Sequence, residues 1–575
     1  MSPSWTAHYD SGVPASLAPY PARTLVDYAR ESGAQHPDAP AIFFKGTRIS
    51  NVELDRLSDR FASGLVDAGV RRGDRVALLL PNCPQFLIAE LGAWKAGATV
   101  LPLNPLYAAS ELIEPLRNAG VEIVVTLTPF YPLLKEIQRQ TPVRRVIATS
   151  IKEYLPPLLR LLFTLFKEKK AGHRIALEPG DAWFQSYLER RATALPPPPS
   201  PDDPAILLMS GGTTGTPKAV VGLHRCLVAA GLQLKTWLQP PGSALQTADV
   251  APQDITVVAL PLFHVYACVG IQSHAITGRI PMALVPNPRD IDDLLKTITS
   301  VRPTLFSAVP ALFIALLNHP RVKARAVDFS PIKTCFSGAA PLMAATKAQF
   351  EALTGGRIVE GYSLTEAMMA CVVNPLNGVN KTGSVGVPLP DVEIAIVDAE
   401  SGQSFLRQGE TGEIIVRAPQ LMAGYFNNPE ETERALRTHD ALGPWLHTGD
   451  LGYLDDDSFL FIVDRQKDLI KTSGFQVWPR EIEEVLAAHP SVEEVGVAGV
   501  ADDLKGEVVK AWVVKRAGTD PSVDELRTFC RQKLAPYKAP AHIEFRDSLP
   551  KTMAGKVLRR VLVAEHNTAA PESEA

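Results

Sequence analysis

The sequence predicts an α/β protein, with a large N-terminal domain of layered α/β subdomains and a small α+β domain at the C-terminus. Three observations support this fold class. The chain has 575 residues, more than one ordinary hydrophobic core can organise. Short apolar runs alternate with helical periodicity in its first part, which is typical of parallel α/β layers. From about residue 391 onward, short strands separated by turns replace that alternation.

The apolar runs and periodic stretches give the predicted elements in chain order. Bounded apolar runs predict buried strands, and a longer run with helical spacing predicts a helix. A proline-rich connector at about residues 196–204 separates two series of such elements. The predicted strands lie at residues 75–82, 99–105, 121–128, 254–261 and 281–287, and the predicted helices at 85–97 and 292–303.

The C-terminal part has a different pattern of predicted secondary structure. Short strands are predicted at residues 392–403, 412–419 and 459–465. Beyond Lys467 the pattern reads helix, strand, strand, helix, which predicts a compact α+β unit. We therefore expect an N-terminal domain over residues 1–466 and a C-terminal domain over 467–575, with a disordered end from Asn567.

Composition excludes several classes of protein. The formal net charge of −4 argues against a nucleic-acid binder, which usually carries a basic excess. The N-terminus lacks the basic and apolar regions of a secretory signal, and no apolar run reaches the roughly 18 residues of a membrane span. The six cysteines lie far apart, so we expect free thiols in a reducing compartment and a cytoplasmic protein.

The strongest local signal is the segment 205–218, AILLMSGGTTGTPK. An apolar strand runs into a loop of glycines and threonines that ends in Lys218. Glycines allow backbone N–H groups to approach an anion, and the hydroxyls and the ammonium add donors and charge. The segment therefore predicts a phosphate-binding loop. It is not a Walker A loop, because Pro217 stands where that pattern needs glycine.

Four further segments are weak when taken singly. Residues 360–366 (EGYSLTE) place a carboxylate beside hydroxyls, a set that suits Mg²⁺, and a tyrosine ring that can stack on a base. Residues 445–450 (WLHTGD) offer an aspartate for a ribose, and residues 464–471 (DRQKDLIK) form a charge cluster. Residues 550–556 (PKTMAGK) place a lysine after a glycine-containing turn near the end of the chain. Each also suits a solvated turn or surface charge cluster.

The order of these segments gives them meaning. TTGTPK, GYSLTE, HTGD, DRQKD and a late GK resemble, in that order, the adenylate-forming superfamily of acyl-CoA synthetases, luciferases and peptide-synthetase adenylation domains. The resemblance covers residues 38–560, and the sequences of the individual motifs are most similar to those of bacterial long-chain fatty acyl-CoA ligases. Ala219 and Ser363 replace glycines of the usual pattern, and both are small enough for the site to survive.

The resemblance implies roles for individual residues in ATP binding and adenylation. Glu366 would bind Mg²⁺, Thr365 would contact the α-phosphate, and Lys556 would bridge the carboxylate and the α-phosphate. His264 would line the entrance of the acyl site, although a core histidine is the alternative. The residues implied for the β- and γ-phosphates are Thr213, Thr214, Gly215 and Lys218; those for adenine are Gly338, Ala339, Ala340 and Tyr362; those for the ribose are Asp450 and Arg465.

The resemblance also implies a second half-reaction with a mobile C-terminal domain. Lys467 matches the hinge about which that domain rotates. After rotation Lys556 leaves the site and the segment around Gly474 arrives, where a glycine leaves room for the pantetheine arm of coenzyme A.

The sequence therefore predicts an ATP- and Mg²⁺-dependent enzyme that converts a fatty acid of medium to long chain into acyl-AMP and then into acyl-CoA. Two alternatives share the fold: an acyl-AMP ligase that loads a carrier protein, and an enzyme that closes a β-hydroxy acid to a β-lactone. A non-catalytic nucleotide sensor is disfavoured, because the charged residues of all five motifs are retained. Acyl-chain length and oligomeric state have no marker in the sequence.

Residues 155–174 (LPPLLRLLFTLFKEKKAGHR) combine a dense apolar run with a basic end. The run is too short to cross a bilayer. One hypothesis is peripheral membrane contact, with the apolar face in the acyl region and the basic end near anionic headgroups. The alternative is a helix buried against its own domain.

Overall fold

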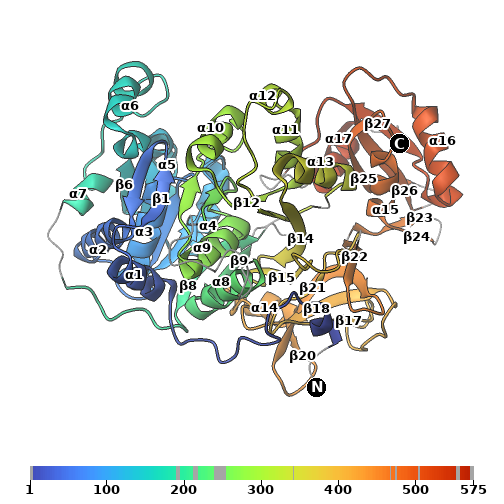
Figure 1. Ribbon diagram of the computed structural model, residues 1–575, viewed down its shortest axis with the longest axis horizontal. Helices are drawn as coiled ribbons and strands as arrows, with labels where there is room; N and C mark the ends of the chain where they lie inside the picture. Colours follow the sequence, from blue (N-terminus) through green and yellow to red (C-terminus); the bar gives the residue numbers. More distant parts are fainter. Residues whose placement is uncertain are drawn as a thin grey trace. The chain divides into compact units, whose positions relative to one another are not determined.

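The computed structural model confirms the predicted α/β class (Figure 1). It describes residues 4–189, 194–210, 218–238, 254–340, 342–381, 383–465, 468–472, 475–502, 506–551 and 557–569. The chain divides into a large and a smaller compact unit. Unit 1 comprises Met1–Thr382, Gly386–Glu393 and Arg417–Leu446, and unit 2 comprises Gly383–Val385, Ile394–Val416 and His447–Ala575. The boundary expected at Lys467 lies outside the described residues and stays a prediction, as does the mobility of the C-terminal domain.

The first sheet of unit 1 has the strand order β19-β9-β8-β4-β3-β5-β6-β7. Its central strands are parallel and almost fully buried, as expected of strands covered on both faces. The predicted strands at 75–82, 99–105 and 121–128 are confirmed. The strands are β3 (Arg75–Leu79), β4 (Thr99–Pro102), β5 (Ile123–Leu127), β6 (Arg145–Thr149), β7 (Ala182–Trp183), β8 (Pro204–Ser210), β9 (Lys218–Leu223) and β19 (Gly424–Tyr425).

The second sheet of unit 1 has the order β16-β15-β14-β13-β12-β10-β11-β1-β2. Strands β14 to β1 along this order pair in parallel, and the antiparallel strands stand at the two ends. The strands are β1 (Pro40–Phe44), β2 (Thr47–Ser50), β10 (Thr256–Val258), β11 (Met282–Leu284), β12 (Leu305–Ala308), β13 (Thr334–Ser337), β14 (Arg357–Leu364), β15 (Met369–Val373) and β16 (Val387–Pro388). The predicted strands at 254–261 and 281–287 are confirmed.

Helices connect and cover these strands. They include α1 (Leu25–Gln35), α2 (Asn51–Asp67), α4 (Ala109–Asn118), α5 (Tyr131–Ile137), α8 (His224–Leu238), the π-helical η6 (Tyr266–Ile271), α9 (Gln272–Gly278), α10 (Ile291–Val301), α11 (Pro310–Asn318), α13 (Ala344–Thr354) and α14 (Pro429–Ala435). The helix predicted at 292–303 is confirmed as α10.

The helix predicted at residues 85–97 is α3 (Pro84–Lys95), and every one of its residues is buried. It carries two ionisable side chains into the core. The Lys95 ammonium contacts the Asp55 and Asp59 carboxylates at 2.5 and 2.7 Å. Glu90 instead accepts a hydrogen bond from the Gln272 side-chain amide, and burial raises the pKa of Glu90 to about 8. The Glu90 carboxyl is therefore held in its protonated form near neutral pH.

Unit 2 contains a sheet in which β21 (Pro444–Leu454) lies between β18 (Gly412–Arg417) and β22 (Leu460–Arg465), with β17 (Glu393–Val397) beside β18. A second sheet has the order β24-β23-β26-β25, with β27 parallel to β26. The predicted helix–strand–strand–helix pattern is confirmed. Its elements are α15 (Pro479–Ala487), β25 (Val492–Asp502), β26 (Gly506–Lys515) and α16 (Val523–Lys533), joined by β23 (Ile470–Thr472), β24 (Phe475–Val477), β27 (His542–Arg546) and α17 (Arg559–Ala569).

The expectation of disorder from Asn567 is wrong for three residues. Asn567, Thr568 and Ala569 form the last turn of α17. Leu562 anchors this helix in an apolar cluster on the hairpin β25–β26, and helical hydrogen bonding then continues outward from the anchor. The residues beyond Ala569 lie outside the described part of the chain.

All six cysteines are free thiols, as predicted, and the structure shows that all six are also buried. Burial raises the pKa of the thiols, for example to about 11 for Cys530 and to about 12 for Cys83 and Cys371.

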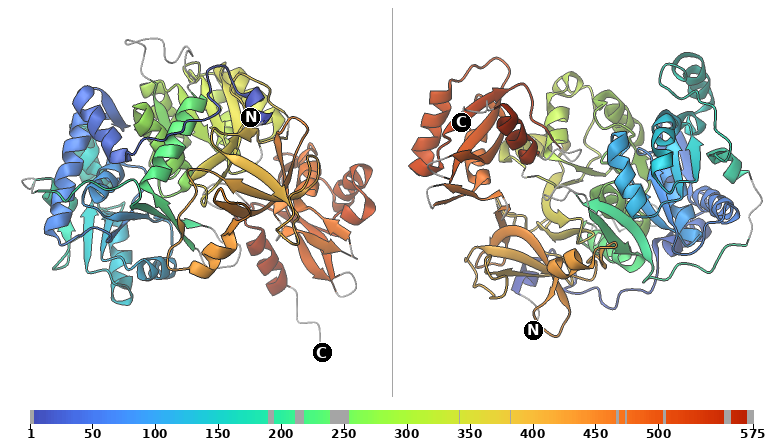
Figure 2. Two further views of the ribbon diagram at one scale, coloured as in Figure 1. Left: turned by 90° about the horizontal axis from the view of Figure 1, so that it is seen from below. Right: turned by 180° about the vertical axis from the view of Figure 1, so that it is seen from behind.

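The segment at residues 155–174 contains α6 (Pro157–Leu162), which continues directly into the π-helical η5 (Phe163–Lys167). In Figures 1 and 2, α6 stands at the margin of unit 1. No residue of these two helices is buried.

Candidate functional site

The glycine- and threonine-rich loop connects two paired strands of unit 1. Strands β8 and β9 are antiparallel, and Ser210 is the register partner of Lys218. The two ends of the loop are therefore held side by side. The predicted phosphate ligands Thr213, Thr214 and Gly215 lie between them, outside the described residues.

Lys218 begins β9 and is linked to a second predicted residue. Its ammonium pairs with the Glu431 carboxylate on α14 and lies 5.2 Å from the centre of the Tyr425 ring. The Tyr425 hydroxyl donates a hydrogen bond of 3.0 Å to Glu366 Oε1. Lys218 and Glu366, which the sequence predicted from two separate motifs, therefore contact the same tyrosine, Lys218 at its ring and Glu366 at its hydroxyl. Neither Tyr425 nor Glu431 was singled out from the sequence.

Glu366 follows the end of β14, in a turn that leads into β15. The Met422 N–H donates to the backbone carbonyl of Glu366 at 2.8 Å, which fixes the turn from the side of β19. Thr365 stands at the start of the same turn, where its carbonyl accepts from Met368 N–H at 3.1 Å. Within the described residues, Glu366 Oε2 makes no hydrogen bond. A carboxylate with one oxygen held and one open suits Mg²⁺, which takes one or two protein carboxylates and fills its shell with phosphates and water.

The residues predicted for adenine follow β13 and lie on β14. The two strands are parallel, and Ser337 on β13 is the register partner of Glu360 on β14. Gly338, Ala339 and Ala340, which follow Ser337, and Tyr362, which follows Glu360, therefore lie at the same edge of the sheet. A Cβ on Gly338 would lie 3.3 Å from the Tyr266 ring. Tyr362 is only 7% exposed, and it lies in β14 itself rather than in a loop. This carboxyl edge of parallel strands is the usual place for a ligand in α/β proteins.

His264 lies in the turn between β10 and η6. Its side chain is half-buried, and burial lowers the pKa of His264 to about 4. The imidazole is therefore uncharged at neutral pH. Its backbone carbonyl accepts from Ala267 and Cys268 N–H groups, both at 3.0 Å, and so starts η6.

An apolar cavity of about 20 Å³ lies behind η6. Its lining includes Tyr266, Gly270, Phe306 and Met369. The Tyr266 hydroxyl donates to the Phe336 carbonyl at 2.8 Å, which ties η6 to the end of β13. The cavity and the predicted adenine edge therefore share one wall.

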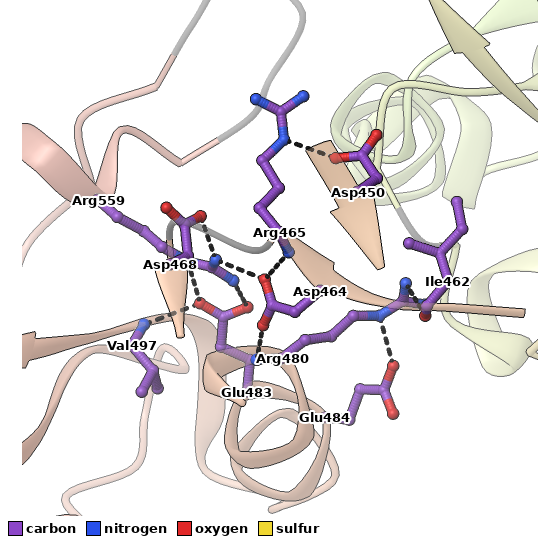
Figure 3. A network of polar contacts seen from close by, with 10 residues as sticks. All are labelled: Asp450, Ile462, Asp464, Arg465, Asp468, Arg480, Glu483, Glu484, Val497 and Arg559. Atoms are coloured by element: carbon purple, nitrogen blue, oxygen red, sulfur yellow. Dashed lines mark hydrogen bonds and ion pairs between the residues drawn. The ribbon is translucent and has the colours of Figure 1, made fainter. Parts of the chain in front are cut away.

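The two residues predicted for the ribose lie on neighbouring strands of unit 2. Asp450 on β21 is the register partner of Arg465 on β22, and Arg465 Nε lies 3.0 Å from Asp450 Oδ1. Figure 3 shows the two side chains directed toward each other. Asp450 is 5% exposed, so the guanidinium provides a counter-charge for a nearly buried carboxylate.

The charge network beside this pair includes Asp464 and Asp468, two residues of the DRQKD motif for which the resemblance implied no individual role. Arg559, the first residue of α17, contacts the carboxylates of Asp464, Asp468 and Glu483 at 3.1, 2.7 and 2.7 Å (Figure 3). Its burial alone would lower the pKa of Arg559, but these acids raise it above its ordinary value. The signal in the sequence was the acidic and basic residues of DRQKD, which carry no indication of their distant partner.

Arg559 fixes the chain just after the predicted catalytic lysine. Lys551 and Val557 form an antiparallel bridge, so the two ends of the segment that holds Lys556 are close together. Lys556 itself, Lys467 and Gly474 lie outside the described residues, and their predicted roles are untested.

Comparison with known proteins gives a consistent result. Residues 29–426 match the model of a family described as AMP-binding enzyme, and residues 481–556 match the AMP-binding enzyme C-terminal domain. The chain is 39% identical to a long-chain-fatty-acid–CoA ligase of Bacillus subtilis and 36% identical to one of Escherichia coli O157:H7, with 98% of each chain covered in both cases. Among solved structures it resembles ATP-bound MatB from Rhodopseudomonas palustris, with a TM-score of 0.78, 29% identity, and 95% of this chain and 99% of that chain covered.

Proposed function

The chain belongs to the family of AMP-binding enzymes, and from this membership we propose that it is an AMP-forming fatty acid–CoA ligase. It activates a fatty acid with ATP to an acyl-AMP, with release of pyrophosphate, and transfers the acyl group to coenzyme A. The relatives that match over 98% of the chain, which are named long-chain-fatty-acid–CoA ligases, support this reaction and this class of acid.

The chemistry requires positioning and charge stabilisation more than covalent help. A free carboxylate has no good leaving group, and the mixed anhydride with AMP provides one. In the first step the fatty-acid carboxylate attacks the α-phosphorus and pyrophosphate leaves. Negative charge spreads over phosphate oxygens in that transition state, so nearby cations and donors lower its free energy.

The link between Lys218, Tyr425 and Glu366 is the observation that carries this proposal. It brings a cation for the β- and γ-phosphates and a carboxylate for Mg²⁺ to one tyrosine, the cation over its ring and the carboxylate at its hydroxyl. Glu366 would hold Mg²⁺, which when bound would neutralise part of the charge of the phosphates. Thr365, at the start of the same turn, would donate to the α-phosphate.

The remaining roles follow from the position of each group. Tyr362 and the segment Gly338–Ala340 would flank the adenine ring at the carboxyl edge of the sheet. Asp450, oriented by Arg465, would accept hydrogen bonds from the ribose hydroxyls. His264 would line the entrance of the acyl site as a neutral imidazole, because its lowered pKa leaves it uncharged at neutral pH.

Three proposed residues act through the second half-reaction or the C-terminal domain. Lys556 would bridge the carboxylate and the α-phosphate during adenylation. Lys467 would serve as the hinge residue, and Gly474 would line the path of the pantetheine arm after rotation. The match of residues 481–556 to the C-terminal domain of the family supports the assignment of Lys556, whereas Lys467 and Gly474 lie before that match and rest on the resemblance of their motif.

Location is a further part of the proposal. Within the described chain, no helix is both long and apolar enough to cross a membrane. We propose a cytoplasmic enzyme that touches a membrane peripherally through residues 155–174. The free thiols support a reducing compartment, and an apolar fatty acid is concentrated in bilayers.

The test measures pyrophosphate release and thioester formation with acids from acetate to oleate, with and without coenzyme A. We expect pyrophosphate release with fatty acids, and acyl-CoA only when coenzyme A is present. Lys218→Ala and Glu366→Gln should lose both products, which excludes a contaminating activity. Release without thioester would instead favour loading of a carrier protein or β-lactone formation, and no release would favour a nucleotide sensor.

A further inference from the structure

The helices α6 and η5 expose an unusual concentration of apolar side chains. Among the described residues, six of the fourteen exposed large apolar side chains lie within nine consecutive positions of this segment. Single exposed apolar residues are ordinary on a protein surface, but a contiguous group marks an interaction site. The six are Leu158 (67% exposed), Leu159 (45%), Leu161 (55%), Leu162 (42%), Leu165 (65%) and Phe166 (72%), and we call them the leucine face.

The segment is attached to unit 1 through its opposite side. Glu168 pairs with Lys152 at 2.5 Å, and His173 Nδ1 lies 2.8 Å from the Thr128 hydroxyl. The Phe163 ring packs edge-on against His173, with 5.1 Å between the ring centres. Phe163 and Glu168 are only partly exposed, unlike the six residues of the leucine face, so they lie on the side of the segment that contacts the protein.

The orientation is therefore the reverse of the usual one. A surface helix normally buries its apolar stripe and turns its polar side to water. Here polar contacts and one phenylalanine hold the helix to the protein, and the leucine face is turned outward. The contacts also show that the segment is held in place, so the exposure belongs to a folded arrangement. The alternative of a helix buried against its own domain is not what the structure shows.

The segment that carries the leucine face also carries exposed basic side chains, most of them just after that face in the sequence. The one acid of residues 155–174, Glu168, is already paired with Lys152, so positive charge dominates the exposed surface. Within the described residues, none of the exposed basic side chains of this segment forms an ion pair. They are Arg160, Lys167, Lys169, Lys170 and Arg174.

We propose that the leucine face, together with the exposed basic side chains that follow it in the segment, forms a docking surface for an anionic lipid bilayer. Apolar side chains that enter the acyl boundary while lysines and arginines meet anionic headgroups are the physical signature of interfacial membrane binding. The position of α6 at the margin of unit 1 leaves it accessible to a flat surface (Figures 1 and 2). The choice of a bilayer rests in part on the proposed function, because the substrate of a fatty acid–CoA ligase resides there.

The experiment is co-sedimentation of the full-length protein, without substrates, with two kinds of vesicle: phosphatidylcholine mixed with phosphatidylglycerol, and phosphatidylcholine alone. We expect the wild type to bind the mixed vesicles several-fold more than the neutral ones, and high salt to reduce that difference. Leu162→Asp with Phe166→Asp should lose most of the binding and keep its activity on a short-chain acid.

The matched control is Leu442→Asp with Phe405→Asp. It makes the same chemical change at two exposed residues, 76% and 53% exposed, that lie far from the leucine face in the sequence. It should bind vesicles like the wild type. The Leu162 and Phe166 double variant is replaced if its melting temperature shows that it fails to fold. The replacement is Lys167→Gln with Lys169→Gln and Lys170→Gln, because these three side chains are exposed. This triple variant should lose the preference for mixed vesicles.

Three results would overturn the proposal: no wild-type binding to mixed vesicles, unchanged binding by the variants, or equal loss in the control. A second copy of the chain is the competing occupant, and it would appear as a wild-type dimer that the double variant abolishes while vesicles are ignored. Vesicle binding without any activation of fatty acids would retain the docking surface and refute the proposed function instead.

Discussion

The pairing of Lys218 with Glu431 has a direct consequence for ATP affinity. The Lys218 ammonium lowers the pKa of the Glu431 carboxyl, so this acid is ionised at neutral pH. It therefore offsets the positive charge that Lys218, in its proposed role, would offer to the phosphates of ATP. The triphosphate of ATP would therefore have to share the Lys218 ammonium with Glu431 or displace Glu431 from it. We predict that Glu431→Gln tightens ATP binding. Glutamine keeps the shape of the side chain, and the backbone N–H of residue 431 still donates to Asn428 at 3.2 Å.

The size of the effect follows from the exposure of the pair. The side chains of Lys218 and Glu431 are 22% and 27% exposed, so the pair lies between a surface and a buried salt bridge. Pairs near the surface contribute about 0.2–1 kcal/mol. We take the upper half of that range, which corresponds to a decrease of about 3- to 5-fold in the Kd for ATP. Because Glu431 touches no reacting atom, kcat should change less than KM.

The assay is the KM for ATP in pyrophosphate release, together with a direct ATP titration, at low and high salt. The matched control is Glu430→Gln, which removes the same charge from the adjacent, exposed position of the same helix turn. It should leave ATP affinity nearly unchanged, since solvent and salt screen it. Weaker ATP binding in Glu431→Gln would show that the acid positions Lys218 instead of competing for it. Equal effects of both substitutions would show that only net charge matters.

Three further predictions concern the two half-reactions and the core. Lys556→Ala should reduce adenylation by about 10²-fold and spare thioester formation from supplied acyl-AMP, as expected when one charge stabiliser is lost; equal loss of both steps would refute its assignment. Gly474→Leu should leave ATP–pyrophosphate exchange intact and block acyl transfer to coenzyme A, whereas loss of exchange would indicate a role in folding or ATP binding. Glu90→Gln should raise the free energy of unfolding by at most about 3 kcal/mol at pH 7. In the unfolded chain the Glu90 carboxyl loses its proton above about pH 4.5, whereas the buried carboxyl keeps its proton up to about pH 8. The wild type therefore loses stability as the pH rises from 4.5 to 8, and the glutamine variant does not. Thermal melts at several pH values check this last effect: the gain should vanish near pH 4.5, and a constant gain would mean that titration of Glu90 is not its cause.

The sequence predicted the layered part of the fold well, because its pattern is local. The run RVALLLPN forms β3 and the predicted helix after it forms α3. Apolar runs of these lengths must be buried, and a buried strand or helix is the usual way to do so. The end of the chain was predicted less well. Its last helical turn depends on Leu562 packing against a distant hairpin, which no local pattern records.

The site shows the same limit. The motifs identified Lys218 and Glu366, but not the residue between them. Tyr425 lies 59 residues from Glu366 and outside the recognised motifs, so its hydrogen bond is a product of strand pairing between β9 and β19. The Arg559 network was likewise hidden, because its acids are up to 95 residues away. Hydropathy also did not decide whether the leucine face is exposed or buried against its own domain, because composition does not indicate which side of a helix packs against the protein.

The burial of all six cysteines has a practical consequence. A thiolate reacts with disulfide reagents, and the raised pKa values keep these side chains as thiols at neutral pH. A thiol-reactive dye added to the working enzyme should therefore report coenzyme A and not the protein. The consumption of coenzyme A can then be followed continuously with the native sequence, with no cysteine replaced, and any slow background signal would measure the opening of the fold itself.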